Sequence, residues 1–467
     1  MPPEAAISVR RPSYGRQELK GVRMKICVIG LGYVGLPTAA MFAANGHYVV
    51  GVDVCDRILK ALGRGETFIC EPGLGEAVRW AVSEGRLIAR EDPEPADAYI
   101  ICVPTPINPD HSADLSYIER AVRSILPCVR KGNMVILEST SPPGTTRDLV
   151  CGILGGSGLT PGTDLYVAYC PERVLPGRIL TELVHNSRVI GGINSESAIK
   201  ARALYSCFVR GEMYITDSVT AEMCKLVENT YRDVNIALAA ELAMICEKLG
   251  INAWEVIRYA NKHPRVNLHQ PGPGVGGHCI AVDPWFIVQK QPETARMIGL
   301  ARRINDSMPR YVLERIKALL KNISGGRKVC VLGVTYKPDV DDTRESPVIR
   351  LISMLKAEGG YSVVAVDRHA DYEGSRGRDL YEAVKGCHLL LLAVNHREFE
   401  RVDFARIRER MAYPCVLDTR NFWRAEEVEA AGLSYHLLGW GKQSDEEGPD
   451  GGVPVPAARG FGGAEDR

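Results

Sequence analysis

The sequence lacks the patterns by which a chain usually holds a metal ion or a disulfide framework. Fourteen cysteines are present, but none forms a CxxC pair and none is compactly spaced with histidine. Zinc and a set of structural disulfides are therefore disfavoured, and we expect no metal site. Several cysteines, including Cys27, Cys102 and Cys330, lie inside apolar runs. This distribution favours reduced thiols in a cytoplasmic protein.

The sequence also lacks net charge and long apolar runs. Lysine plus arginine equals aspartate plus glutamate, at 57 each in 467 residues, so the composition favours neither nucleic acid nor a membrane surface as a partner. No apolar run approaches the roughly 20 residues of a membrane-spanning helix, and residues 1–23 contain no apolar core of a secretory signal. We expect polar tails at 1–23 and 442–467. The second tail is predicted to be disordered, since it is rich in glycine, proline and charge.

Alternating strand and helix patterns predict an α/β protein. Short apolar runs typical of buried strands occupy residues 25–30, 47–54, 98–104, 134–140 and 165–171, with a helical pattern at 36–46. Such alternation favours a parallel sheet covered by helices on both faces. Further runs follow at 328–334, 361–367, 388–394 and 415–420. We therefore predict two doubly wound, Rossmann-like parallel-sheet domains, at 24–217 and 325–441, built as variations on one plan.

The region between the two sheet domains, residues 218–324, is predicted to be a helical middle domain. Ser218–Leu249 indicates one long helix, with Ser218 as its N-terminal cap and Gly250 as its end. Because this helix is apolar around most of its circumference, we expect it to be buried within the molecule.

The first predicted strand is followed by a candidate dinucleotide site. A G-x-G-x-x-G turn is formed there by Gly30, Gly32, Tyr33, Val34 and Gly35. Its glycines permit a tight turn, close approach of a pyrophosphate and close packing of the following helix. Asp53 ends the next strand at roughly the 20-residue distance of a ribose-binding carboxylate, and its charge would repel a 2′-phosphate. NAD is therefore favoured over NADP; the alternative is a glycine turn without a ligand.

Two threonines lie in loops that leave the ends of predicted strands. Thr105 belongs to "VPTP" and Thr140 to "STSPPGTT". Ligands of open α/β sheets bind at the carboxyl ends of the strands, so both threonines are placed to contact the dinucleotide. The alternative is that proline and threonine simply form turns there.

The long predicted helix carries a polar stripe. Glu222, Lys225, Asn229 and Arg232 follow spacings of three and four residues, so they share one face. One interpretation is a solvated face with an ion pair between residues three apart. The other is a buried lysine and arginine, which require partners or a ligand.

Four glycines and a histidine surround Cys279 in "PGPGVGGHCIAVDPW". A buried structural thiol is the common case. The glycines favour a nucleophile instead, because they let backbone amides approach a reacting centre, and Asp283 can position a water or the ammonium group of Lys225. A dehydrogenase with such a thiol can trap an aldehyde as a thiohemiacetal, oxidise it to a thioester and release an acid with water.

Seven motifs in residues 24–441 together resemble the UDP-glucose/GDP-mannose dehydrogenase family. They are "GLGYVGLP", "VPTP", "ESTSPPGT", "CPERVLPG", "EMCKLVENTYRDVN", "GVGGHCIAVDP" and "YKPDVDDTRESP". Within the family, residues 261–286 resemble the branch that acts on UDP-N-acetyl-D-mannosamine. The resemblance implies NAD-dependent, four-electron oxidation of the C6 alcohol of a UDP-N-acetylhexosamine to a uronate, through a cysteine thioester, for polysaccharide biosynthesis. It also implies a homodimer or larger homo-oligomer, because the middle helix of the family is a subunit contact.

The resemblance also implies roles for matching positions. Cys279 would be the nucleophile and Lys225 the proton donor or acceptor and oxyanion stabiliser, assisted by Asn229 and Asp283. The nucleotide-sugar pocket would include Lys225 and Asn229 together with Arg173, Val174, Arg232, His263, Arg265, Gly276, Tyr336, Lys337 and Arg420. Arg344 would reach the NAD. One departure concerns the adenosine: many relatives place a basic residue five positions after the ribose aspartate, where this chain has Ile58 beside Arg57.

Other functions stay open at the level of the sequence. The nearest are a UDP-N-acetylglucosamine or UDP-glucose 6-dehydrogenase. A two-electron hydroxyacid dehydrogenase would need neither the thiol nor the second nucleotide domain. A non-catalytic sensor of nucleotide sugars would have no reason to keep Lys225, Asn229, Cys279 and Asp283 together.

Overall fold

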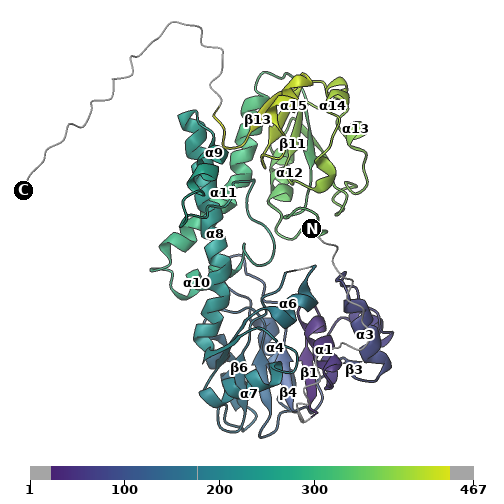
Figure 1. Ribbon diagram of the computed structural model, residues 1–467, viewed down its shortest axis with the longest axis vertical. Coiled ribbons are helices and arrows are strands. Elements are labelled where there is room, and N and C mark those ends of the chain that lie inside the picture. The colour runs from purple at the N-terminus through teal and green to yellow at the C-terminus, as the bar shows by residue number, and fades with distance from the viewer. Residues whose placement is uncertain (1–22, 176, 442–467) are drawn as a thin grey trace, which may run out of the picture.

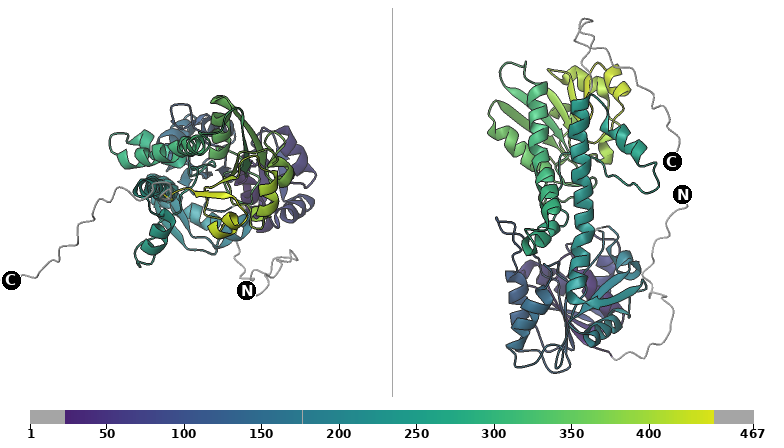
Figure 2. Two further views of the ribbon diagram at one scale, coloured as in Figure 1. Left: turned by 90° about the horizontal axis from the view of Figure 1, so that it is seen from above. Right: turned by 90° about the vertical axis from the view of Figure 1, so that its left-hand side faces the viewer.

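The computed structural model describes residues 23–175 and 177–441, so the predicted tails lie outside the described residues apart from position 23. Two α/β domains lie at opposite ends of the molecule. The helices α8 (Ser218–Leu249) and α11 (Arg296–Leu319) run side by side between them (Figures 1 and 2). The predicted fold class, two Rossmann-like sheet domains with a helical middle region, is confirmed.

The first domain contains an eight-stranded sheet in the order β3-β2-β1-β4-β5-β6-β7-β8. Its strands are β1 (Lys25–Ile29), β2 (Tyr48–Val52), β3 (Leu87–Arg90), β4 (Ala98–Ile101), β5 (Met134–Leu137), β6 (Tyr166–Tyr169), β7 (Arg188–Gly192) and β8 (Met213–Asp217). Strands β1 to β6 pair in parallel, as predicted for this sheet, whereas β7, a strand that the sequence patterns did not indicate, pairs antiparallel with β6. The connecting helix α6 (Ile179–His185) has 7 residues. The whole connection, residues 170–187, would be long enough for a parallel crossover, so its length does not explain why β7 runs opposite to β6.

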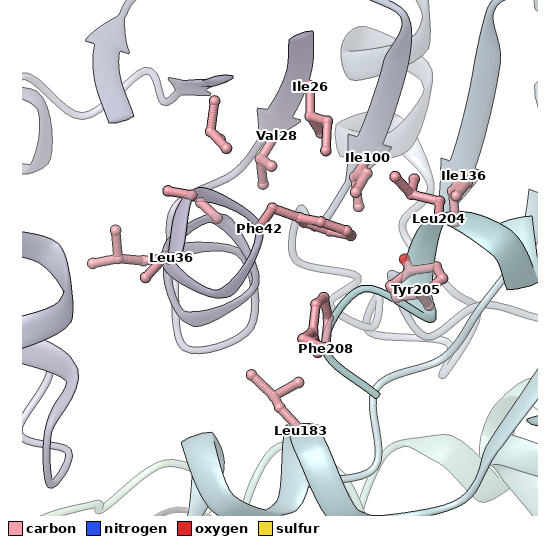
Figure 3. Close-up of a cluster of buried hydrophobic side chains, with 14 of the residues drawn as sticks. Ile26, Val28, Leu36, Phe42, Ile100, Ile136, Leu183, Leu204, Tyr205 and Phe208 are labelled. Carbon is pink, nitrogen blue, oxygen red and sulfur yellow. The ribbon is translucent and has the colours of Figure 1, made fainter. Parts of the chain in front are cut away.

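Helices cover both faces of this sheet, as predicted. They are α1 (Gly35–Ala44), α2 (Asp56–Gly63), α3 (Leu74–Ser83), α4 (Ser116–Ile125), α5 (Cys151–Gly155) and α7 (Ser195–Tyr205), with a π-helical turn η1 (Thr145–Val150) before α5. Alternate residues of one strand enter different cores: Ile26 joins a cluster with Phe42 and Tyr205 (Figure 3), whereas Cys27 joins one with Ile118. This period of two places a core on each face of the sheet.

Helix α8 has the predicted length, but its first cap and its burial differ from the predictions. The cap is Asp217, whose Oδ1 accepts a hydrogen bond from the Thr220 N–H at 2.9 Å, so the assignment of Ser218 as cap is wrong by one residue. Gly250, with φ of 71°, ends the helix as predicted. Part of the apolar surface is exposed rather than buried, at Met223, Val227, Tyr231, Leu238, Ile245 and Leu249. An apolar pattern shows that a face is suited to packing, not that its own chain covers it.

The remaining middle helices are α9 (Ala253–Ala260) and α10 (Asp283–Lys290). A buried ion pair joins the two long helices: Arg302 on α11 lies 2.5 Å from the carboxylate of Asp233 on α8. Among the described residues, no helix combines the length and the apolar character needed to span a bilayer.

The third domain has a five-stranded, all-parallel sheet in the order β10-β9-β11-β12-β13. Its strands are β9 (Arg327–Leu332), β10 (Tyr361–Val366), β11 (Leu389–Leu392), β12 (Cys415–Asp418) and β13 (Ser434–Leu437). Its helices are α12 (Pro347–Ala357), α13 (Leu380–Ala383), α14 (Phe404–Arg410) and α15 (Ala425–Ala430), with a 3-10 turn η2 (Arg397–Phe399).

The two sheet domains share one construction at the end of their first strand. Gly30 and Gly333 both have positive φ, 90° and 84°. Each donates its N–H at 2.8 Å to the last residue of the neighbouring strand. An aspartate follows the neighbouring strand, Asp53 in the first domain and Asp367 in the third. Its carboxylate accepts a hydrogen bond from the N–H of the residue after the glycine. The predicted common plan is therefore visible in the backbone, although one glycine and one aspartate are too little to reveal a sequence repeat.

Candidate active site

The glycine turn after β1 leaves room for a ligand at one glycine and packs tightly at the other two. A Cβ on Gly30 would lie 2.7 Å from the carbonyl oxygen of Cys102, and a Cβ on Gly35 would collide with the carbonyl of Gly30. A Cβ on Gly32 would meet nothing within 4 Å. Gly32 thus faces open space, and no side chain caps the start of α1 at Val34. The N–H of Gly35, the first residue of α1, is available to a phosphate, as a dinucleotide turn requires, whereas the Leu36 N–H donates to the carbonyl of Gly32 at 3.2 Å.

Asp53 is fixed at the edge of this turn. Its Oδ2 accepts from Leu31 N–H at 2.8 Å and its Oδ1 accepts from Cys55 N–H at 2.9 Å. The carboxylate is thereby held at the end of β2, beside the glycine turn, where a dinucleotide ribose is bound in folds of this type.

The two predicted threonines lie at the carboxyl ends of β4 and β5. The hydroxyl oxygen of Thr105 is buried and has no hydrogen-bond partner among the described residues. Thr140 starts the loop whose Gly144 and Thr146 donate N–H bonds of 2.6 and 2.7 Å to the carboxylate of Glu222. Glu222 therefore holds this loop rather than forming the ion pair with Lys225 considered above. An unpartnered hydroxyl and an open glycine turn fit a dinucleotide at this edge of the sheet.

The predicted catalytic residues converge where α8 meets α10. Asn229 donates to the Asp283 carboxylate at 2.5 Å, and Arg232 donates to the side-chain oxygen of Asn229. The Asp283 N–H donates to the carbonyl of Cys279 at 2.8 Å, which ties the first turn of α10 to the thiol loop. Asp283 is buried, with 2% of its surface exposed.

Electrostatics link Lys225 to this cluster. Burial raises the pKa of Asp283 to about 6, and the positive charges of Lys225 and Arg232 and the bond from Asn229 oppose that rise. Burial likewise raises the pKa of the Cys279 thiol to about 11, with the Asp283 carboxylate adding to the rise and Lys225 opposing it. The thiol therefore needs a base nearby before it can attack as a thiolate.

Glu172 joins the same cluster, although we did not single it out from the sequence. It is buried, and its Oε1 has no hydrogen-bond partner among the described residues. Burial raises the pKa of Glu172, and Lys225 is the largest influence that lowers it. Its place just after β6, at the carboxyl edge of the sheet, is the signal that could have identified it.

The glycines around Cys279 allow the thiol loop to pack closely against the third domain. A Cβ on Gly276 would lie 2.7 Å from the Cβ of Tyr336, and one on Gly277 would lie 2.9 Å from the ring of Tyr336. A Cβ on Gly272 would collide with the guanidinium of Arg420. The thiol loop therefore packs against the third domain where Gly276 and Gly277 leave no room for a side chain, and the approach of backbone amides to a reacting centre stays a prediction.

This packing brings cationic groups of the third domain to the thiol loop. Neither Lys337 nor Arg420 forms an ion pair among the described residues, and Arg420 donates its Nε–H to the carbonyl of Ala393 at 3.1 Å. Burial lowers the pKa of Arg420 to about 10, and only Asp418 opposes that fall. A buried cation without a carboxylate partner suits an anionic ligand such as a diphosphate.

Arg344 connects the third domain to the first. It is paired with Asp342 at 2.6 Å, and its guanidinium carbon lies 5.8 Å from the ring centre of Tyr33 in the glycine turn. The Gly277 N–H donates to the carbonyl of Arg344 at 3.0 Å. Arg344 thus lies between the thiol loop and the dinucleotide turn, as its predicted contact with NAD requires.

Other predicted substrate residues have different partners in this chain. Arg173 forms a 2.6 Å ion pair with Glu228, and Val174 packs against the core of the first domain. His263 and Arg265 are exposed in the loop between α9 and α10. No hydrogen bond among the described residues joins either of them to Cys279. Their contact with the substrate stays a prediction.

Three potential metal ligands, Asp339, His369 and His396, lie close together in the third domain. Both ring nitrogens of His396 already have protein partners, because Nδ1 accepts from Asp339 N–H at 2.9 Å and Nε2 lies 3.1 Å from Asp367. These three side chains therefore connect the loops that follow β9, β10 and β11.

Comparison with known proteins identifies the family that shares this arrangement. Three models of the UDP-glucose/GDP-mannose dehydrogenase family match in order: the NAD binding domain at 24–209, the central domain at 219–307 and the UDP binding domain at 330–425. The chain belongs to this family. It is therefore a nucleotide-sugar dehydrogenase with an NAD-type cofactor and a UDP-sugar substrate.

Individual relatives cover nearly the whole of this dehydrogenase. It is 47% identical over 433 residues to a UDP-N-acetyl-D-mannosamine dehydrogenase of Methanocaldococcus jannaschii, covering 91% of this chain and 99% of the relative. It is 45% identical over 420 residues to an NDP-N-acetyl-D-galactosaminuronic acid dehydrogenase of Ralstonia nicotianae, covering 87% and 97%. The structure of the UDP-D-ManNAc dehydrogenase of Pyrococcus horikoshii matches with a TM-score of 0.84 and 39% identity, covering 90% of this chain and all of that one.

Proposed function

We propose that this chain is an NAD-dependent UDP-N-acetyl-D-mannosamine 6-dehydrogenase. It converts the C6 alcohol to a carboxylate by removing two hydrides and adding one water. The observation that carries the proposal is the meeting of Cys279 with Lys225, Asn229 and Asp283 beneath a loop of the third domain that carries unpaired cations. The relatives named UDP-N-acetyl-D-mannosamine dehydrogenase support the choice of sugar.

A dinucleotide bound at the glycine turn would accept one hydride in each oxidation step, so NADH would have to be exchanged for a second NAD⁺ between the two steps. The chain supplies the proton chemistry. Lys225 takes the proton of the C6 hydroxyl as the first hydride leaves, and its positive charge then stabilises the oxyanion that forms when Cys279 attacks the aldehyde. Because burial raises the pKa of Cys279 to about 11, the thiol proton must pass to a neighbouring base during this attack.

Loss of the second hydride from the thiohemiacetal leaves a thioester on Cys279. Hydrolysis then needs a water with a base beside it, and Asp283 is that base. Its pKa of about 6 means that it is ionised at neutral pH yet still able to accept a proton. Asn229 fixes the carboxylate by its 2.5 Å hydrogen bond. Water breaks the C–S bond, and the thiolate recovers a proton as the acid leaves.

The preference for NAD over NADP rests on Asp53. Both of its oxygens accept backbone N–H bonds, so the carboxylate is fixed beside the ribose position. Its negative charge opposes a 2′-phosphate.

We further propose that the enzyme is a homodimer formed by α8. The exposed apolar side chains of α8 border a groove lined by Pro143, Val219, Met223 and Val227. Pairing with a second copy would cover these side chains and would bring an exposed 263–265 loop to the neighbouring site. We place the enzyme in the cytoplasm, where its 14 free cysteines stay reduced.

A substrate panel tests the proposal. UDP-N-acetyl-D-mannosamine, UDP-N-acetylglucosamine, UDP-glucose and GDP-mannose are each assayed with NAD by absorbance of NADH. We expect kcat/KM for UDP-N-acetyl-D-mannosamine to exceed that for UDP-glucose by at least about 10²-fold. UDP-glucose lacks the acetamido group, so the polar groups of the site that hydrogen-bond this group would have no partner. Faster oxidation of UDP-N-acetylglucosamine or UDP-glucose would refute the choice of sugar but not the family.

A further inference from the structure

A hairpin of the first domain reaches across to helix α10 of the middle region. The hairpin follows Thr105 in the loop after β4, and an antiparallel bridge between Ile107 and Ala113 closes it. His111, at its tip, has φ of 65°, a backbone conformation that histidine tolerates better than most side chains. The Ala113 N–H donates to the side-chain oxygen of Gln289 on α10 at 3.0 Å. One loop therefore joins the predicted dinucleotide edge of the sheet to α10.

An aromatic stack completes this contact at the tip of the hairpin. The imidazole of His111 lies almost parallel to the indole of Trp285 on α10, with ring centres 4.2 Å apart and planes inclined by 8°. His111 is exposed, whereas Trp285 is 9% exposed, so the histidine ring is the outer layer of the stack. Trp285 lies in the first turn of α10 together with Asp283. A contact that holds Trp285 therefore also holds the base.

The base of the hairpin packs into the same region. Ala113 shares an apolar cluster with Leu226 on α8 and with Val282. Leu226 directly follows Lys225 in the chain, and Val282 directly precedes Asp283. Helix α10 lies beside the part of α8 nearest the first domain (Figure 1). The hairpin thus packs against both segments that supply the proton chemistry.

We propose that His111 and Trp285 are positioning residues for hydride transfer. The first domain is the NAD binding domain of the family, whereas Cys279 and Asp283 belong to the middle region. The distance over which a hydride moves therefore depends on how these two parts are held together. The stack, with the hydrogen bond to Gln289, fixes α10 against the loop that follows β4. This inference rests on the proposed function, since it takes oxidation at C6 beside Cys279 as the reaction.

Replacement of His111 by alanine and by phenylalanine tests the proposal. Phenylalanine keeps a ring that can stack on Trp285, and alanine does not. Both variants lose the tolerance of histidine for positive φ, so the difference between them isolates the ring. Hydride transfer is followed as NADH absorbance in a single turnover, with enzyme and NAD in excess over the nucleotide sugar. The sugar is used both in its ordinary form and deuterated at C6.

We expect His111→Ala to lower the rate constant of hydride transfer roughly 3- to 10-fold, because a small misplacement of reacting groups is costly. The slowed step should show a primary deuterium isotope effect. His111→Phe should stay within about twofold of wild type, and the Kd for NAD should change less than about twofold in both variants. Tyr117→Leu is the matched control, because this exposed ring of α4 lies 4.6 Å from the guanidinium of Arg120 in its own helix. It should behave as wild type.

The outcomes separate positioning from a purely structural role. If His111→Ala gives a smaller amount of NADH at an unchanged rate constant, it only reduces the folded fraction, and the proposal is wrong. A slowed step without an isotope effect, equal slowing in His111→Phe, or an equal rise in the Kd for NAD would also overturn it. If wild type does not oxidise UDP-N-acetyl-D-mannosamine, the proposed function fails separately. The same comparison is then made with the nucleotide sugar that wild type does oxidise, and the same slowing is expected.

Discussion

Replacing Asp283 by asparagine should stabilise the protein while removing most of its activity. The wild-type carboxylate has a pKa of about 6 in the folded protein, because burial disfavours its charge. An exposed aspartate has a pKa of about 3.9. The folded state therefore binds more protons than the unfolded state between these values, and stability falls as pH rises through this window.

The size of the effect follows from this shift. About two pKa units correspond to about 3 kcal/mol of lost stability above pH 7, and at pH 5 about half of that cost has been relieved. Asparagine cannot ionise and can still accept the hydrogen bond from Asn229. For a chain of this size, about 3 kcal/mol corresponds to a rise in Tm of roughly 3–6 °C.

Thermal unfolding of both proteins at pH 7.5 and pH 5.0, with kcat measured in parallel, checks the prediction. The gain in Tm should shrink at pH 5.0, and kcat should fall by about 10² or more with the loss of a base. Asp164→Asn is a control of opposite sign, since the Thr160 amide and Lys131 hold the pKa of Asp164 below its usual value. That variant should lose stability at pH 7.5. A lower Tm for Asp283→Asn at pH 7.5, or a gain independent of pH, would refute the reasoning.

Further predictions concern the same site. Cys279→Ser should abolish turnover yet leave the Kd for NAD unchanged by calorimetry, because the thiol is needed only for the acyl intermediate. Lys225→Ala should lower kcat by about 10²–10³-fold in steady-state assays through loss of oxyanion stabilisation, and near-normal activity would exclude that role. His263→Ala and Arg265→Ala should raise KM for the sugar more than they lower kcat. In wild type, kcat/KM should fall as pH decreases through about 6, where Asp283 becomes protonated, and a profile flat from pH 5 to 8 would contradict its role as base.

Local signals in the sequence predicted much of the fold. The apolar runs that became β1, β2 and β4 are continuous, and the glycine turn between β1 and α1 combines three glycines with a later aspartate. Four strands were missed: Leu87–Arg90, Arg188–Gly192, Met213–Asp217 and Ser434–Leu437. Of these, Arg188–Gly192 and Met213–Asp217 carry polar residues and glycines and lie beyond the antiparallel turn of the sheet. Their pairing depends on where α6 ends, which no local pattern specifies.

Site residues could be predicted where they lie close together in the sequence. Residues whose partners lie far away in the sequence could not be predicted. The spacing along α8 placed Lys225 and Asn229 on one face, and the thiol loop was conspicuous in sequence. Glu172 was not assigned, because its surroundings depend on Lys225, 53 residues away, and only its place after β6 pointed to the edge of the sheet. The glycines of the thiol loop were recognised, but their contact with the third domain could not be read from the sequence.

The central claim is a four-electron oxidation through an acyl intermediate on Cys279. The most direct test is the ratio of NADH to uronate formed from a limiting amount of UDP-N-acetyl-D-mannosamine, measured by absorbance and by chromatography of the product. The account predicts two NADH for each uronate, with no free aldehyde, because the thioester holds the carbon between the two hydride transfers. One NADH for each sugar consumed, with an aldehyde or ketone accumulating, would contradict it.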